Sequence, residues 1–124
     1  MIWVLVGVGG GIGAMARHAF NHVIHGWAMA ATFPYGIFFI NILGSAIIGL
    51  LGGLLATARL DLSVEARTFL VVGVLGGFTT FSSFSLDTLT LLRSGHSGLA
   101  IWNVVGQVGL SLLAVTVGFR VGSL

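Results

Sequence analysis

The run Gly76-Gly77-Phe78-Thr79-Thr80-Phe81-Ser82-Ser83-Phe84-Ser85 is the part of the sequence best suited to binding an ion. It lies within a mostly apolar stretch at about residues 66–92, in which only Arg67 and Asp87 are charged. Two adjacent glycines weaken a helix by about 1 kcal/mol each relative to alanine, and hydroxyls can bond the backbone groups that a break releases. A broken helix exposes carbonyls on one side and N–H groups on the other, so it could hold a cation or an anion. The alternative is a glycine kink whose hydroxyls bond back to their own helix.

The side chains of this run include candidate contacts for an anion. Phe81 and Phe84 lie three residues apart and so share a helix face, and the edges of their rings carry the positive side of the quadrupole. The same pair could instead pack against a neighbouring helix. The hydroxyls that could serve an anion belong to Thr79, Thr80, Ser82, Ser83 and Ser85.

Five further polar side chains lie in apolar segments elsewhere in the chain. Asn41 could donate two N–H groups to an anion in a pore, or it could hold helices together. Asp87 is the only acid within an apolar span, which makes it a candidate functional group by default. Arg17 could hold an anion or extend to the membrane surface. Gln107 and Ser111 lie four apart, on one face of the last apolar segment.

The composition indicates that lipid surrounds these residues. Of the 124 residues, 56% are hydrophobic and 6% are charged, whereas a soluble domain carries about 25% charged residues. The mean hydropathy is +1.11. The net charge of +2 is too small and too scattered for a nucleic-acid surface, so no nucleic acid is expected as a partner. No cysteine is present for a disulfide or a thiolate metal site.

Four apolar runs with few charged residues reach the roughly 20 residues that a membrane-spanning helix needs. They cover about residues 2–24, 35–57, 66–92 and 99–120. The sequence therefore predicts one all-α membrane domain over residues 1–124, with the third helix broken in mid-membrane. Small residues spaced four apart predict close helix packing. They are Gly9 and Gly13, Ser45 with Gly49 and Gly53, Gly73 and Gly77, and Ala114 with Gly118 and Gly122.

The arginines between and beyond these runs are divided nearly evenly between the two sides of the membrane. Arg59, Arg67 and Arg120 would lie on one side of the membrane, and Arg93 on the other, where Arg17 could join it. We expect a chain with so little asymmetry to insert in both orientations. Two oppositely oriented copies could then form an antiparallel homodimer.

Two patterns point to other functions and are weak. The sequence Gly9-Gly10-Gly11-Ile12-Gly13-Ala14 fits a dinucleotide-binding fingerprint, but the βαβ context and the acid about 20 residues further on are missing. His18, His22 and His25 fall on one helix face at metal-ligand spacing, but no nearby acid or cysteine completes a site. An exposed histidine face is the simpler interpretation.

Three groups of residues together resemble the Fluc family of fluoride channels, also called CrcB. They are Gly13-Ala14 followed by Arg17, Pro34-x-Gly36 followed by Asn41 and Gly44, and the run at 76–85. The last group is the most specific, and the match spans nearly the whole chain.

The resemblance implies a passive fluoride exporter in the cell inner membrane, with no enzymatic chemistry. It implies an antiparallel, dual-topology homodimer of four-helix subunits with two pores between the subunits. A structural sodium ion would be held at the dimer centre by the backbone carbonyls of Gly76 and Thr79. Phe81, Phe84, Asn41 and Ser111 would face fluoride in the pores, with the hydroxyls of the run beside them.

The sequence departs from the family pattern at three positions: Ile37 stands where threonine is frequent, Asp87 where glutamate is common, and Asn103 where tyrosine is familiar. Two other functions remain open. The first is a dual-topology, proton-coupled exporter of small cations or drugs, which would need a carboxylate in the first helix. The second is a purely structural subunit assembled through its glycines, which would carry no ions.

Overall fold

The computed structural model describes residues 1–29 and 31–124, and this part of the chain contains helices and no strands. The first, second and last spans are single helices. The third is built from four consecutive helical pieces, one of which is a π-helix. The elements are α1 (Ile2–Trp27), α2 (Tyr35–Ala56), α3 (Val64–Arg67), the π-helix η1 (Thr68–Leu75), α4 (Gly76–Phe78), α5 (Phe81–Arg93) and α6 (Ser97–Gly122).

Four of the helical stretches are long and apolar enough to cross a membrane: Ile2–Trp27, Tyr35–Ala56, Val64–Arg93 and Ser97–Gly122. All four predicted spans are therefore confirmed, and their ends differ from the prediction by three residues at most. The chain is a multi-pass membrane protein. Hydropathy identified the spans because each consists of a continuous apolar run between polar connectors.

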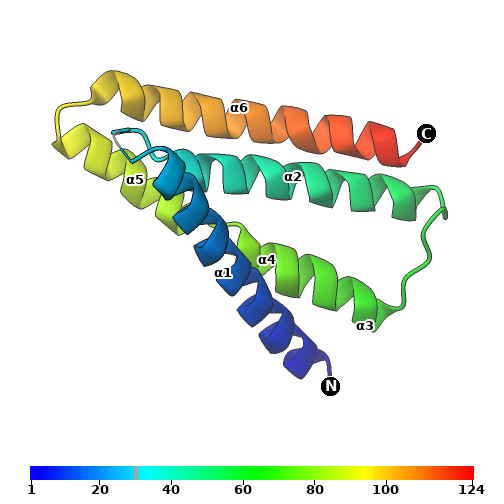
Figure 1. The fold of residues 1–124 in the computed structure, drawn as a ribbon. Coiled ribbons are helices and arrows are strands. Elements are labelled where there is room, and N and C mark those ends of the chain that lie inside the picture. The colour runs from blue at the N-terminus through cyan, green and yellow to red at the C-terminus, as the bar shows by residue number, and fades with distance from the viewer. Residues whose placement is uncertain (30) are drawn as a thin grey trace.

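The second and fourth spans lie side by side and run in the same direction (Figure 1). Their backbones approach closely because the facing residues have no side chain. A Cβ on Gly53 would lie 2.8 Å from the Ser123 nitrogen, and one on Gly118 would lie 2.9 Å from the Leu50 nitrogen. The predicted small-residue faces of these two helices are confirmed.

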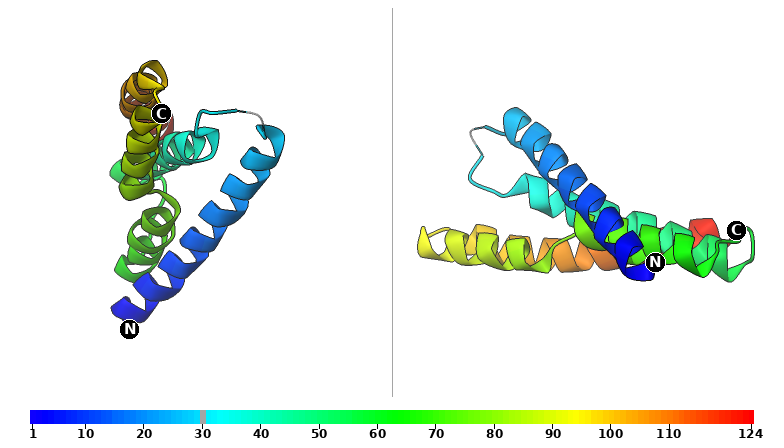
Figure 2. Two further views of the ribbon diagram at one scale, coloured as in Figure 1. Left: turned by 90° about the vertical axis from the view of Figure 1, so that its left-hand side faces the viewer. Right: turned by 90° about the horizontal axis from the view of Figure 1, so that it is seen from below.

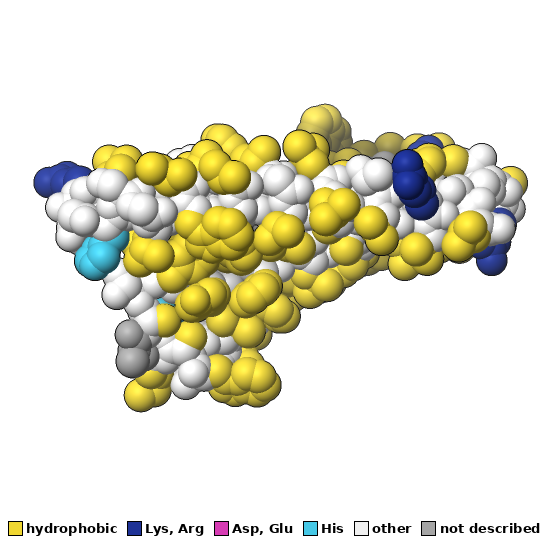
Figure 3. All heavy atoms as spheres, turned by 90° about the horizontal axis from the view of Figure 1, so that it is seen from above, with side chains coloured by type: hydrophobic (Ala, Val, Ile, Leu, Met, Phe, Trp, Pro, Cys, Tyr) yellow, Lys and Arg dark blue, Asp and Glu magenta, His cyan; other side chains and the backbone are white. Residues whose placement is uncertain are grey.

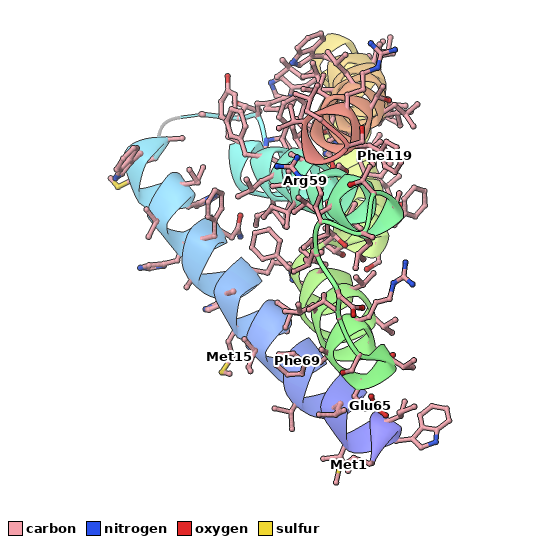
Figure 4. The ribbon with its side chains drawn as sticks, turned by 90° about the vertical axis from the view of Figure 1, so that its right-hand side faces the viewer. Met1, Met15, Arg59, Glu65, Phe69 and Phe119 are labelled. Carbon is pink, nitrogen blue, oxygen red and sulfur yellow. The ribbon has the colours of Figure 1, made fainter. Side chains whose placement is uncertain are left out.

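Helix α1 crosses the third span at an angle and diverges from the other helices toward its C-terminal end (Figure 2). A Cβ on Gly9 would lie 2.7 Å from the Phe69 carbonyl oxygen, and one on Gly13 would lie 2.8 Å from the Phe78 nitrogen. Phe69 lies against α1 at this crossing (Figure 4). The crossing ends one residue before the third span changes conformation.

The third span is interrupted at Thr79 and Thr80, whose φ and ψ angles are −83° and 159°, and −156° and 123°. The two extended residues lie within the run at 76–85 and separate α4 from α5. Gly76 and Gly77, which the sequence analysis placed at the interruption, remain helical, and the chain leaves the helix two residues later, at Thr79. Gly77 instead makes room for the backbone of Gly10, since a Cβ there would overlap the Gly10 carbonyl oxygen.

The π-helix η1 occupies the segment just before the interruption and was not predicted. Its sequence, TFLVVGVL, reads as an ordinary apolar helix. Single π-helical turns often occur next to functional sites because their wider turn displaces the following residues. Here the residues displaced are those that lead into Thr79 and Thr80.

Candidate functional site

A groove of about 370 Å³ lies along the interrupted helix and is open on one side. Its walls come from α2, from the third span on both sides of the interruption, and from α6. We call it the break groove. Residues of the sequence analysis that line it are Asn41, Gly76, Thr79, Thr80, Phe81, Phe84, Gln107 and Ser111.

Asn41 bonds the extended backbone at Thr80. The Thr80 N–H donates to Asn41 Oδ1 at 2.9 Å, and Asn41 Nδ2 donates to the Thr80 carbonyl at 3.0 Å. One side-chain amide thus pairs with the Thr80 N–H, which has left the helical ladder, and with the Thr80 carbonyl at the N-cap of α5. Leaving such groups unpaired in an apolar setting costs about 1–3 kcal/mol each, so this pair stabilises the interruption.

A chain of amide side chains extends from Asn41 to α6 and on to α5. Asn41 Nδ2 also donates to Gln107 Oε1 at 2.5 Å, and Gln107 Nε2 donates to Asn103 Oδ1 at 2.9 Å. Asn103 Nδ2 donates to Thr88 Oγ1 at 2.9 Å, and Thr88 Oγ1 donates to the Phe84 carbonyl at 2.8 Å. Asn103 is fully buried and Gln107 is 4% exposed. We call Asn41, Gln107, Asn103 and Thr88 the amide chain.

The rings of Phe81 and Phe84 contact each other, with centroids 5.3 Å apart and planes at 46°. Their predicted position on one helix face is confirmed. Phe84 is buried, but 77% of the Phe81 surface is exposed in the single chain. In a membrane-spanning chain, a ring so exposed contacts either lipid or a second protein surface.

The hydroxyls of the run bond mainly within their own helix. Thr80 Oγ1 accepts from the Ser83 N–H at 3.2 Å and caps α5, while the Ser85 hydroxyl donates to the Phe81 carbonyl at 2.9 Å. Ser82 Oγ lies 3.3 Å from Thr80 Oγ1, and the Thr79 hydroxyl donates to the Leu75 carbonyl at 3.0 Å. Only the two threonines of this set line the groove.

The two charged candidates take separate positions outside the groove. Arg17 Nη1 donates to the Thr79 carbonyl at 3.2 Å, a contact with the interrupted backbone that the sequence analysis did not consider. Asp87 Oδ2 is buried and has no hydrogen-bond partner among the described residues. No group of three or more His, Cys, Asp or Glu side chains in the described chain could hold a metal ion, so His18, His22 and His25 do not form one.

Sequence reasoning missed the roles of Asn103 and Thr88. Asn103 was noted only as a departure from tyrosine, although Asn103, Gln107 and Ser111 repeat at four-residue spacing and so form a polar stripe on α6. That stripe was the available signal. Thr88 gave none, because threonine is common in membrane helices, where it bonds its own backbone.

Comparison with known proteins adds the family. Residues 4–119 match the family described as "CrcB-like protein, Camphor Resistance (CrcB)". A protein of Francisella philomiragia named "Fluoride-specific ion channel FluC" is 45% identical over 96% of this chain and 92% of its own length. Proteins of the same name from Rhodopseudomonas palustris and Thermus thermophilus are each 44% identical, over 95% and 97% of this chain and 94% of their own lengths. The resemblance found in the sequence is thereby confirmed, and the chain belongs to the CrcB family.

Proposed function

We propose that this chain forms a fluoride channel that exports fluoride passively across the cell inner membrane and so relieves fluoride toxicity. Its relatives are named as fluoride-specific ion channels. They are channels and not enzymes, and this chain is likewise not an enzyme. Neutral hydrogen fluoride crosses lipid from an acidic medium and dissociates inside, and the channel lets the anion leave.

The break groove is the observation that carries the proposal. Fluoride is small and strongly hydrated, so a pore must replace its water with donors at close range. The groove combines amide groups of Asn41 and Gln107, the Ser111 hydroxyl, and the rings of Phe81 and Phe84. Neutral donors and ring edges suit an anion that must bind and then leave, because a fixed cation would hold it too firmly.

The groove is only half of a pore, because it is open on one side and leaves Phe81 mostly exposed. We propose that a second copy in the opposite orientation covers it. The partner's surface beside its own groove would cover this groove, and the two-fold relation would repeat the same contact on the other side. Each of the two grooves then becomes one pore, which gives two pores per dimer.

A structural sodium ion at the dimer centre fits the backbone of the interruption. In a continuous helix the Gly76 carbonyl would accept from the Thr80 N–H, but that N–H donates to Asn41 instead. The Thr79 carbonyl accepts from Arg17. Both carbonyls have left the helical ladder, and carbonyl oxygens are ligands that replace the water of an alkali cation. Gly76 and Thr79 would hold the ion, whose charge would join the two subunits.

The antiparallel arrangement needs both orientations of the chain in the membrane. The structure places Arg17 at the interruption, so it does not count among the arginines at the membrane surfaces. One end of the helices carries Arg59, Arg67 and Arg120, and the other end carries Arg93. Figure 3 shows arginine side chains, in dark blue, at both ends of the molecule. Tags on the termini would report dual insertion if they were accessible from both sides. Access from one side alone would mean that the partner is a different, oppositely inserted chain.

The proton-coupled exporter of small cations is not favoured, since the relatives are named as fluoride channels and α1 contains no carboxylate. The deciding experiment is ion efflux from liposomes that contain the purified protein, followed with fluoride and chloride electrodes. We expect fast fluoride efflux and no chloride efflux. Equal efflux of both anions, or of neither, would refute the proposal.

A further inference from the structure

The amide chain has one direction, and the backbone of Thr80 sets it. The Thr80 N–H can only donate, so the Asn41 oxygen must face it and the Asn41 nitrogen must face the other way. Gln107 must then present its oxygen to Asn41 and its nitrogen to Asn103. Asn103 in turn presents its nitrogen to Thr88. A single backbone N–H therefore fixes the orientation of three amides in succession.

This direction determines which N–H groups remain for an anion. A side-chain amide nitrogen has two hydrogens. Both hydrogens of Asn41 are used, by the Thr80 carbonyl and by Gln107 Oε1. Gln107 Nε2 gives one hydrogen to Asn103, and its second has no protein partner among the described residues. Asn103 also keeps one hydrogen but is fully buried and does not line the groove.

We propose that Gln107 is the amide that donates to fluoride in the groove, and that Asn41 and Asn103 are positioning residues that hold it in place. This inference rests on the proposed fluoride channel and assigns the donor within it. It reverses the roles expected from the sequence, in which Asn41 was the direct donor. Gln107 lines the groove together with Phe84 and Ser111, so an anion there meets the amide, a hydroxyl and a ring at once.

The simpler explanation for Gln107 is helix packing, since amides often hold membrane helices together. Packing and donation differ in what they require of the side chain. Packing through the amide chain requires that residue 107 has an oxygen that accepts from Asn41 and a second polar atom that bonds Asn103. Donation requires the remaining N–H. A glutamate at position 107 could accept from both Asn41 and a turned Asn103, whose oxygen would then accept from the Thr88 hydroxyl in place of the Phe84 carbonyl, but it would have no N–H.

The test compares variants by fluoride efflux from liposomes, with the dimer fraction of each measured by crosslinking in the same membranes. Gln107→Glu retains the length and branching of the side chain, removes the N–H donor and adds a carboxylate, which repels fluoride when ionised. Gln107→Met retains the side-chain length and removes both polar atoms. Thr116→Val is the matched control on α6, because the exposed Thr116 hydroxyl bonds only the carbonyl of Leu112 in its own helix.

We expect the wild type and Thr116→Val to conduct fluoride equally, and both Gln107 variants to conduct at least about tenfold more slowly at an unchanged dimer fraction, as the loss of one buried hydrogen bond predicts. Wild-type flux in Gln107→Glu would overturn the donor assignment, whatever happens to Gln107→Met, and would leave the fluoride channel standing. If Gln107→Met did not assemble, Gln107→Glu would still decide. No fluoride flux through the wild type would instead refute the channel itself.

Discussion

Substituting Gly13 with alanine tests whether the crossing of α1 positions the interruption. A Cβ at Gly13 would lie 2.8 Å from the Phe78 nitrogen and would overlap the Val74 carbonyl oxygen. Both are backbone atoms of the third span, so no side-chain rotation can relieve the contact. The helices must separate, and Arg17, one turn further along α1, would move away from the Thr79 carbonyl that it bonds at 3.2 Å.

The chain offers a matched control two residues away. Gly11 is exposed on the same helix, and a Cβ there has no neighbour within 4 Å. Both substitutions gain the same helix propensity, up to about 1 kcal/mol, so this gain cancels in the comparison. The remaining difference is the overpacking at Gly13, which costs about 1–3 kcal/mol. We therefore expect Gly13→Ala to be less stable than Gly11→Ala by about 1–3 kcal/mol.

The measurement is reversible unfolding in mixed detergent micelles, followed by the fluorescence of the native tryptophans. Fluoride efflux of the same variants shows whether the displacement reaches the groove, and we expect a loss in Gly13→Ala alone. Equal unfolding free energies for the two variants would show that the crossing is looser than the structure indicates. The argument that α1 positions the interruption would then fail.

Three further substitutions test the groove and the interruption. Asn41→Asp places a carboxylate oxygen next to two acceptors, the Thr80 carbonyl and Gln107 Oε1. We expect fluoride efflux to fall about 10-fold or more, whereas the Thr116→Val control should keep wild-type efflux. Phe81→Ile removes the ring edge but keeps apolar bulk, so efflux should fall while size-exclusion chromatography shows the same assembly; wild-type efflux would exclude Phe81 from the pore. Thr80→Val removes the cap of α5 and should lower the unfolding free energy by about 0.5–2 kcal/mol in the same micelles; no change would mean that Asn41 alone holds this segment.

The spans and their packing faces were predictable because both are local properties of the sequence. Each span is a continuous apolar run, and the spacing of Gly49 and Gly53, or of Gly9 and Gly13, places small residues on one face whatever the partner is. The position of the interruption was not predictable to the residue. It depends on Asn41, which is 39 residues away from Thr80 in the sequence and meets it only in the fold. A local rule about glycine therefore pointed to the segment but not to the two residues that leave the helix.

The candidate groove was predictable in its membership but not in its bonding. Hydroxyls, rings and amides in apolar segments can be recognised from residue types alone, and most of the candidates on α2, α6 and the run do meet, although Ser82, Ser83 and Ser85 do not line the groove. Which amide faces which cannot be recognised, because the direction of the amide chain follows from one backbone N–H. The result is that Asn41, the residue expected to donate, has both hydrogens engaged.

The amide chain also explains why Asn103 is not an isolated departure from the family pattern. A fully buried asparagine in a membrane helix is stable only if its oxygen and nitrogen both have partners, here Gln107 and Thr88. Replacing Asn103 alone with leucine would leave Gln107 Nε2 without its acceptor and would free that amide to turn away from Asn41. Replacing Gln107 as well would remove the group left unpaired. The two substitutions should therefore couple: the double variant should lose less unfolding free energy than the sum of the losses in the two single variants. Such coupling is expected only if the residues of the amide chain act as one unit that shapes the break groove.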